Sequence, residues 1–153
     1  MNFPAPTLSI VVPCFNEAEA LPLTAMRLLN QLRQMIAAGM IGGESHVLFV
    51  DDGSIDATWT LISQLNQESS RFRGLKLSRN RGHQNALLAG LMHAEGDVVI
   101  SIDADLQDDL EVMRQMTQST RKPSTSCSAY AWTAPATRPS SASPRKPITA
   151  SSP

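Results

Sequence analysis

Two aspartates separated by a single residue follow a strongly apolar run in the second half of the chain. The run from Val98 to Ile102 is typical of a buried strand, and it leads directly into Asp103 and Asp105. Residues i and i+2 of an extended segment point to the same side, so both carboxylates can face one spot. Two carboxylates at one spot repel each other unless a cation lies between them or one is protonated. The pair therefore indicates a Mg²⁺ or Mn²⁺ site with oxygen ligands. The commoner origin of such a pair is a solvated turn or a helix cap.

Two further clusters place polar or ring-bearing side chains after predicted strands. In VVPCFNEAEAL, Pro13 and Phe15 can form the wall of a pocket for a planar base, and Glu17 can accept hydrogen bonds. In VDDGSIDAT, Asp52 can bind a base edge or a ribose hydroxyl. The alternative interpretation of both clusters is a turn followed by a capped helix.

The cluster SRNRGHQNALLAG combines two arginines with a histidine. Arg79 and Arg81 are suitable counter-charges for a diphosphate or a phosphate acceptor, and equally they can be solvated surface charges. His83 is either a catalytic base or a surface residue at the start of a helix, and we expect the latter. Cys14 follows an apolar run and is expected to be a small buried residue.

Strands and helices alternate in the predicted structure. We expect strands at Leu8–Pro13, Val47–Val50, Phe72–Leu77 and Val98–Ile102, and helices after Asn16, from Asp56, over Gly82–Ala94 and over Leu110–Gln118. Asn16 is expected to cap the first helix, with Glu17 and Glu19 in its first turn. This order predicts an α/β fold with a mostly parallel sheet and helices on both faces. Ligands of such sheets bind beyond the carboxyl ends of the strands, where all four clusters would meet.

Composition divides the chain near residue 120. Residues 1–120 hold all 14 acidic and 8 of the 13 basic residues, whereas 121–153 hold 5 basic and no acidic ones. The second segment also contains 8 Ser, 4 Thr, 6 Pro and 6 Ala without apolar periodicity. It cannot bury enough surface to offset its ordering entropy, so we predict that 121–153 is a disordered tail. We interpret the tail as the product of a reading-frame change, a hypothesis that the nucleotide sequence tests.

Bulk properties exclude several classes of function. The predicted folded portion is acidic and poor in aromatic residues, which argues against a nucleic-acid partner. The two cysteines give no disulfide framework. The start of the chain lacks the pattern of a secretion signal, and no apolar run reaches the length of a membrane span. We therefore expect a cytoplasmic protein without a transmembrane segment.

The four clusters together resemble a known family. SIVVPCFNEAEAL, VDDGSIDAT, SRNRGHQNALLAGL and GDVVISIDADLQDD occur in family order within residues 8–112. They are similar to the motifs of inverting family 2 nucleotide-sugar glycosyltransferases, which have a GT-A (Rossmann-like) fold. The pair GHQ and DADLQ favours the polyprenyl-phosphate sugar transferases, such as dolichol-phosphate mannose synthase and the undecaprenyl-phosphate glucosyltransferases. The family domain extends well beyond residue 120, so the resemblance covers only its N-terminal, nucleotide-binding half.

The resemblance implies a role for each matching residue. It implies nucleotide contacts from Pro13, Phe15, Glu17, Asp52 and Asp103, phosphate contacts from Arg79 and Arg81, and metal ligands Asp103, Asp105 and Gln107, with the two aspartates as the catalytic pair. The implied reaction transfers a hexose from a UDP- or GDP-sugar, with inversion and with Mg²⁺ or Mn²⁺, to a polyprenyl phosphate. Such an acceptor would bring the protein to the inner membrane surface.

Three alternatives remain open. The first is a non-catalytic, truncated nucleotide-sugar-binding remnant, which would bind a donor without transferring its sugar. The second is a phosphate-transferring enzyme with an aspartate nucleophile, although that class needs its nucleophile after the first strand and Asp103 follows the fourth. The third is a Rossmann dehydrogenase, which is disfavoured because no G-x-G-x-x-G follows the first strand.

Overall fold

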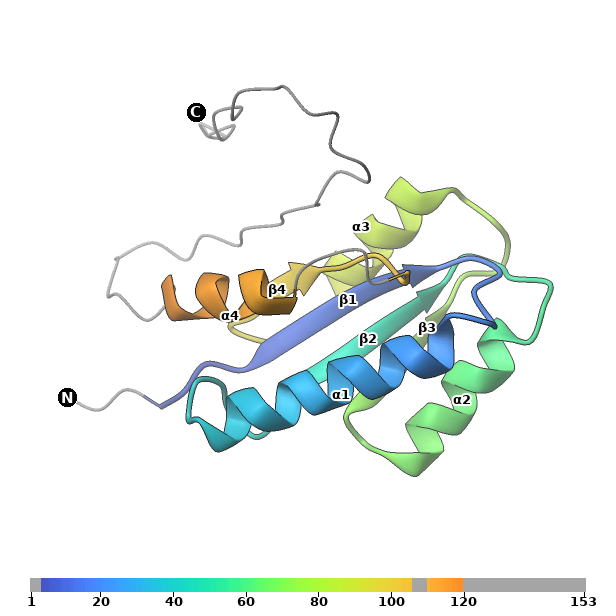
Figure 1. Ribbon diagram of the computed structural model, residues 1–153. Helices are drawn as coiled ribbons and strands as arrows, with labels where there is room; N and C mark the ends of the chain where they lie inside the picture. The colour runs from blue at the N-terminus through green and yellow to red at the C-terminus, as the bar shows by residue number, and fades with distance from the viewer. Residues whose placement is uncertain (1–3, 106–109, 120–153) are drawn as a thin grey trace, which may run out of the picture.

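In the computed structural model, strands and helices alternate through the described part of the chain, residues 4–105 and 110–119 (Figure 1). The elements are β1 (Leu8–Cys14), α1 (Leu21–Ala37), β2 (His46–Asp51), α2 (Thr58–Glu68), β3 (Phe72–Lys76), α3 (His83–His93), β4 (Val98–Ser101) and α4 (Leu110–Ser119). This order confirms the predicted one, and no strand boundary differs from its expected position by more than about one residue.

All four strands are parallel and lie in the order β3-β2-β1-β4. In the register, Ile10 of β1 lies opposite Val47 of β2 and Ile100 of β4. Every residue of β1 is buried, which agrees with its apolar sequence and its place inside the sheet. The chain moves outward from β1 to β3 and then returns to place β4 beyond β1. The direction of strand order therefore reverses between β1 and β4.

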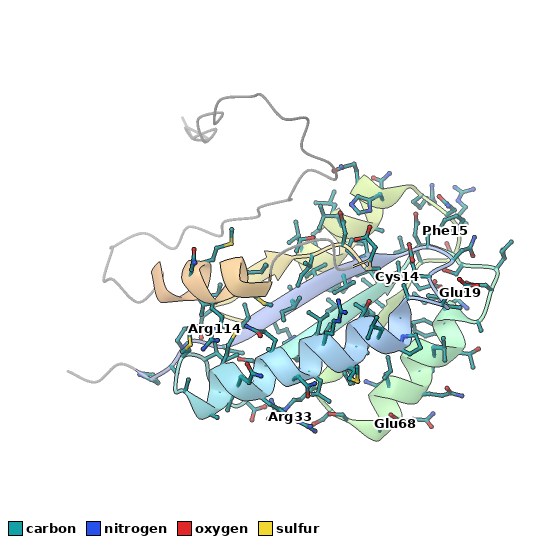
Figure 2. The ribbon with its side chains drawn as sticks, in the orientation of Figure 1. Cys14, Phe15, Glu19, Arg33, Glu68 and Arg114 are labelled. Carbon is teal, nitrogen blue, oxygen red and sulfur yellow. The ribbon has the colours of Figure 1, made fainter. Side chains whose placement is uncertain are left out.

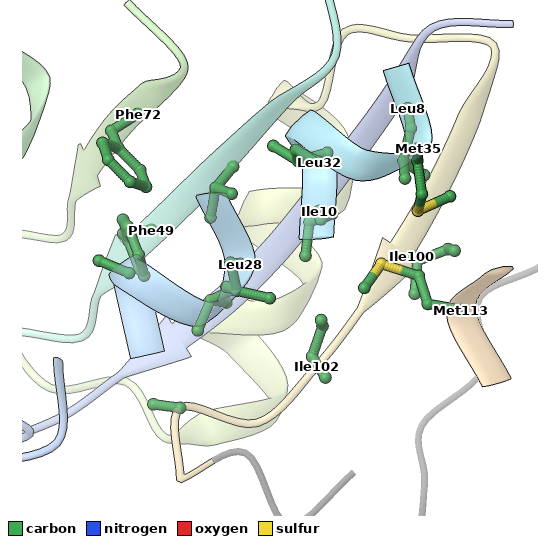
Figure 3. Packing of buried hydrophobic residues seen from close by; sticks show 14 of the residues in the cluster. Leu8, Ile10, Leu28, Leu32, Met35, Phe49, Phe72, Ile100, Ile102 and Met113 are labelled. Atoms are coloured by element: carbon green, nitrogen blue, oxygen red, sulfur yellow. The ribbon is translucent and has the colours of Figure 1, made fainter. Parts of the chain in front are cut away.

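The first face of the sheet is covered by α1, α2 and α4. Its core is one cluster in which Leu28 of α1 packs with residues of the sheet. Phe49 and Phe72 lie with ring centroids 5.9 Å apart, and Met113 of α4 lies beside Ile100 (Figure 3). The elements distant in sequence are therefore joined by a continuous apolar core.

The second face of the sheet is covered by α3. Val11, Val50 and Ala86 belong to the smaller apolar cluster on this side. A Cβ atom on Gly90 would lie 2.4 Å from Val11 Cγ1 and 2.8 Å from Val50 Cγ2. The helix backbone therefore touches the sheet directly at this position, and helices on both faces confirm the predicted layers.

The prediction that Asn16 caps the first helix is wrong. The helix α1 begins at Leu21 with Ala20 at its N-cap, and its first turn contains no acidic residue. Asn16 instead has a left-handed φ of 54°, and its side-chain oxygen accepts the N–H of Ile55 at 3.0 Å. The long-range bond competes with local capping, so the asparagine joins two loops rather than starting a helix.

The start of α2 also differs from the expected one. The helix begins at Thr58, two residues after Asp56. Asp56 still supports the start of the helix, since its Oδ1 accepts the backbone N–H of Thr58 at 2.9 Å.

Some predictions fall on residues that the structure does not describe. The predicted tail at 121–153 and the predicted metal ligand Gln107 both lie outside the described residues. Among the residues that the structure does describe, no helix combines the length and apolar character that crossing a bilayer requires.

Candidate functional site

A pocket lies at the carboxyl ends of the strands, beside the point where the strand order reverses. Its volume is about 290 Å³, and its lining comes from all four loops that follow the strands. The lining residues are Pro13, Cys14, Phe15, Glu17, Asp52, Asn80, Gly82, His83, Ala86, Asp103, Ala104 and Asp105. Figure 2 shows Cys14 and Phe15 at this end of β1. The position agrees with the general rule for ligand binding in open parallel sheets.

The loops that follow β1 and β2 are held together by hydrogen bonds from side chains to backbone. Ser54 Oγ accepts the N–H of Asn16 at 2.9 Å, and Thr58 Oγ1 accepts the N–H of Glu17 at 2.9 Å. Asp56 Oδ2 accepts the N–H of Ala18 at 3.1 Å. These bonds fix the segment that carries Phe15 and Glu17 relative to the end of β2, so the pocket wall is built in advance of any ligand.

Asp52 holds the loop that leads into α3. Its Oδ1 accepts the N–H of Arg81 at 2.7 Å, and its Oδ2 accepts the N–H of Gly82 at 2.9 Å. The residue is only 2% exposed. A carboxylate offers about four lone-pair positions, so these two bonds leave acceptor capacity on the side of Asp52 that lines the pocket.

Gly53 makes this contact between loops possible. It has a φ of 71°, and a Cβ atom on it would lie 2.5 Å from both the carbonyl carbon of Arg79 and the nitrogen of Asn80. A side chain at this position would therefore push the loop away from Asp52. The predicted turn after β2 is present, and its glycine serves a close approach between backbones.

Negative charge is concentrated on the pocket. Asp103 and Asp105 both line it, as the spacing of the pair predicted, and Glu17 and Asp52 line it too. Burial raises the pKa of Glu17 above its ordinary value of 4.5, and the nearby charges of Asp105, Asp56 and Asp103 raise this pKa further. Asp103 and Asp105 are therefore close enough to Glu17 to disfavour its charged form.

The residues of the pocket fit a divalent cation. No group of three or more His, Cys, Asp or Glu suited to a metal occurs among the described residues. Mg²⁺ is normally held by one or two carboxylates together with waters and substrate phosphates rather than by an all-protein cage. A pair of aspartates in an electronegative pocket has the hard oxygen donors that this coordination needs, so Asp103 and Asp105 match it.

The predicted phosphate-binding arginines do not line the pocket in the described part of the chain. Arg79 and Arg81 are exposed residues of the loop between β3 and α3. The backbone of this loop forms part of the pocket wall through Asn80 and Gly82. The phosphate-binding role of the two arginines stays a prediction from the sequence.

His83 is an exposed residue at the start of α3, as its sequence context predicted. It also lines the pocket, with Nε2 3.7 Å from Asp103 Oδ1. The sequence did contain a signal for this position. His83 directly follows the loop after the third strand, and that loop lies at the same edge of the sheet as the aspartates. His83 can thus supply a hydrogen-bond donor opposite the acidic residues.

Cys14 has a structural role, as the sequence indicated. Its thiol is 2% exposed, and its Sγ lies 3.4 Å from the carbonyl oxygen of Val12. Burial raises the pKa of the Cys14 thiol far above its usual range, and the charges of Glu17 and Asp51 act in the same direction. The thiol therefore stays protonated and unreactive at neutral pH.

Comparison with known sequences gives a consistent result. Residues 9–147 match the family model described as Glycosyl transferase family 2. The uncharacterized glycosyltransferase YkoT of Bacillus subtilis (strain 168) is 51% identical over 111 residues, which are 71% of this chain and 33% of the relative. The prophage bactoprenol glucosyl transferase homolog of Escherichia coli (strain K12) is 41% identical over 108 residues, 69% of this chain and 33% of the relative.

A third relative is the undecaprenyl-phosphate 4-deoxy-4-formamido-L-arabinose transferase of Enterobacter sp. (strain 638). It is 37% identical over 102 residues, 66% of this chain and 29% of the relative. This chain thus spans about a third of the length of the curated relatives that it matches.

Solved structures share the fold. The mannosyltransferase PcManGT from Pyrobaculum calidifontis, in complex with GDP-Man and Mn²⁺, superposes with a TM-score of 0.61 at 22% identity, covering 78% of this chain and 33% of that one. Residues 1–349 of Staphylococcus aureus TarS superpose with a TM-score of 0.55 at 24% identity, covering 73% of this chain and 31% of that one. The parallel sheet with helices on both faces is therefore part of a GT-A fold.

Proposed function

The chain belongs to glycosyl transferase family 2, and on this basis we propose that it forms the donor-binding part of a hexosyltransferase. The donor is a nucleotide-diphosphate sugar, and the acceptor is a polyprenyl phosphate. Transfer proceeds with inversion and depends on Mg²⁺ or Mn²⁺. The observation that carries the proposal is the acidic pocket at the reversal of strand order, where Asp103 and Asp105 lie with the loops after β1 and β2.

The nucleoside is assigned to the wall formed by the first two loops. Pro13 and Phe15 provide a flat apolar surface against a base, and Phe15 remains 43% exposed for that contact. Glu17 and Asp52 accept hydrogen bonds from the base and the ribose, since both line the same pocket. Asp103 contacts the ribose or the metal from the opposite side.

Asp103 and Asp105 are the proposed protein ligands of the cation, with Gln107 as a further oxygen ligand. When bound there, Mg²⁺ or Mn²⁺ neutralises the developing charge on the departing nucleoside diphosphate. Arg79 and Arg81, in the loop between β3 and α3, would supply additional positive charge to the phosphates. The GDP-Man and Mn²⁺ bound in the PcManGT complex support this choice of donor class and metal.

The names of two relatives support a lipid-phosphate acceptor. One is a bactoprenol glucosyl transferase homolog, and another is an undecaprenyl-phosphate transferase. A phosphate monoester has a second pKa of roughly 6, so it is largely ionised at neutral pH. The acceptor oxygen therefore attacks the sugar carbon without a strong general base, and it approaches from the face opposite the leaving group. The acceptor would hold the protein at the cytoplasmic face of the membrane.

Turnover is the direct test of this function. The chain is incubated with radiolabelled UDP- and GDP-hexoses, Mn²⁺ and undecaprenyl phosphate, and label is measured in the extracted lipid. We expect at most weak label in the lipid fraction, because the chain spans about a third of its relatives' length, and no label after addition of EDTA or when Asp105 is replaced by asparagine. Transfer that is equally fast with EDTA would contradict metal dependence.

A second candidate function is donor binding without transfer. It is favoured by the coverage, because the chain spans only about a third of the relatives' length. Mn²⁺-dependent binding of a nucleotide sugar without any lipid label would support this candidate over the complete reaction.

A further inference from the structure

A threonine in the first helix reaches across to the segment between the two aspartates. The hydroxyl of Thr24 donates a hydrogen bond to the carbonyl oxygen of Ala104 at 2.5 Å, although the two residues are 80 positions apart. Thr24 is 2% exposed and Ala104 is 4% exposed, so the bond is shielded from water. The backbone N–H of Thr24 donates separately to the carbonyl of Ala20, the N-cap residue of α1, so the long-range contact comes from the side chain.

The position of Ala104 gives this bond its importance. The N–H of Ile102 donates to the carbonyl of Val11 at 3.0 Å, and beyond this bond the chain leaves the sheet in a turn. Ala104 lies between Asp103 and Asp105, and all three residues line the pocket. A fixed Ala104 carbonyl restricts the rotation of the peptide groups on which both aspartates are carried.

The usual role of a buried helical threonine is different. Such a hydroxyl commonly bonds to a carbonyl three or four residues earlier in its own helix. Thr117 in α4 does this, since its hydroxyl donates to the carbonyl of Met113 at 2.8 Å. Thr24 satisfies its hydroxyl in another element instead. This difference separates a positioning role from ordinary satisfaction of a buried polar group.

We propose that Thr24 is a positioning residue that orients Asp103 and Asp105 toward the cation and the donor phosphates. The proposal rests on the proposed function, because it assigns a purpose to the arrangement of the proposed metal ligands. Thr24 itself is not among the residues that line the pocket. It acts through the carbonyl of Ala104.

The test compares Thr24→Val, Thr24→Ser and the control Thr117→Val. The two valine variants each remove one buried hydroxyl bonded to a carbonyl at nearly constant side-chain shape, and Thr117 is not a lining residue of the pocket. Mn²⁺ is titrated calorimetrically into each protein, alone and with UDP or GDP. Thermal unfolding of the same samples reports the general structural cost.

We expect both valine variants to lower the melting temperature by similar amounts. Only Thr24→Val should weaken Mn²⁺ binding, by about 10–100-fold, which is the usual effect of removing a group that orients a metal ligand. Thr24→Ser should restore affinity, because it keeps the hydroxyl. Equal Mn²⁺ affinity in Thr24→Val and the wild type would overturn the proposal, and so would equal weakening in Thr117→Val.

A second measurement separates this proposal from the proposed function. Hydrogen exchange of the backbone is measured for the peptide that contains residues 102–105. Faster exchange in Thr24→Val, but not in Thr117→Val, supports the anchoring role. If wild-type protein binds no Mn²⁺ under any condition, the metal-dependent function is refuted. Unchanged exchange in Thr24→Val then refutes the anchoring role as well.

Discussion

Replacing Gly53 by alanine is expected to damage the fold and the pocket together. The new Cβ would lie 2.5 Å from backbone atoms of Arg79 and Asn80, so the loop has to move by about 1 Å to reach an ordinary contact of about 3.5 Å. A shift of that size along the bond would stretch the 2.7 Å contact between Asp52 and the N–H of Arg81 beyond hydrogen-bonding range. The wall of the pocket would lose its attachment to β2.

The expected cost has two parts. An alanine with the left-handed φ of 71° costs about 1–2 kcal/mol in backbone strain. Overpacking against the loop costs a further ~1–3 kcal/mol, so the free energy of unfolding should fall by about 2–5 kcal/mol in total.

Gly39 provides a matched control. It has a similar φ of 66°, but a Cβ atom on it would have nothing within 4 Å. Gly39→Ala should therefore cost only the strain of about 1–2 kcal/mol. The difference in unfolding free energy between the two variants measures the cost of the close approach of the loop to Gly53.

Urea denaturation followed by circular dichroism measures both variants, and nucleotide binding is measured on the same samples. We expect Gly53→Ala to be less stable than Gly39→Ala and to bind nucleotide more weakly. Equal stability of the two variants, within about 0.5 kcal/mol, would refute the reasoning about the loop contact.

Three further predictions concern the core and two titrating groups. Phe49→Ala removes a fully buried ring and should lower the free energy of unfolding, measured in urea, by about 3–5 kcal/mol. Leu88 is 55% exposed, so Leu88→Ala should change this free energy by less than about 0.5 kcal/mol. Equal losses of stability in the two variants would contradict the place of Phe49 in the core. Burial lowers the pKa of His46 below 6.5. The stability that neutral His46 contributes is therefore complete above about pH 6.5 and declines as the pH falls through the lowered folded pKa. His46→Gln should remove this part of the pH dependence of the urea midpoint, and an unchanged pH profile would contradict the prediction. The pKa of Glu17 is raised, so its contribution to stability is complete below about pH 4.5 and is lost as the pH rises through its folded pKa. Glu17→Gln should accordingly raise the melting temperature at pH 7.5 and leave it nearly unchanged at pH 4, and a lower melting temperature at pH 7.5 would refute the account of the acidic pocket.

Several parts of the fold follow from local sequence patterns. β1 and β2 are mostly apolar because helices cover both faces of the sheet, and this pattern identifies buried parallel strands from sequence. The alternation with helices then brings the loops after each strand to one edge. Asp103 and Asp105 could be assigned to the pocket for that reason alone.

Contacts between distant residues account for what the sequence did not reveal. Asn16 has a side chain suited to a helix cap, but its bond to Ile55 is made possible only by the packing of two loops. The hydroxyl of Thr24 similarly bonds to a carbonyl on a different element. A pattern along the chain cannot indicate such partners, because they depend on how β2 and β4 are placed on either side of β1.

The place of His83 in the pocket also depends on a contact between distant residues. Its position at the start of a helix was predictable, whereas its distance of 3.7 Å from Asp103 results from the crossing of α3 behind the sheet to β4. The two hydrogen bonds from the backbone of Arg81 and Gly82 to Asp52 also follow from loop geometry. The types of residue at the site were visible in the sequence, and folding determined which of them meet.

The most direct test of the central claim is calorimetric titration of UDP and GDP into the chain with and without Mn²⁺. The wild type is compared with Asp105→Asn and with Glu68→Gln, a matched loss of one negative charge on the exposed surface of α2 (Figure 2). We predict nucleotide binding that requires Mn²⁺ in the wild type and in Glu68→Gln, and that is lost in Asp105→Asn. Undiminished Mn²⁺-dependent binding in Asp105→Asn would contradict the assignment of the acidic pair as the metal site.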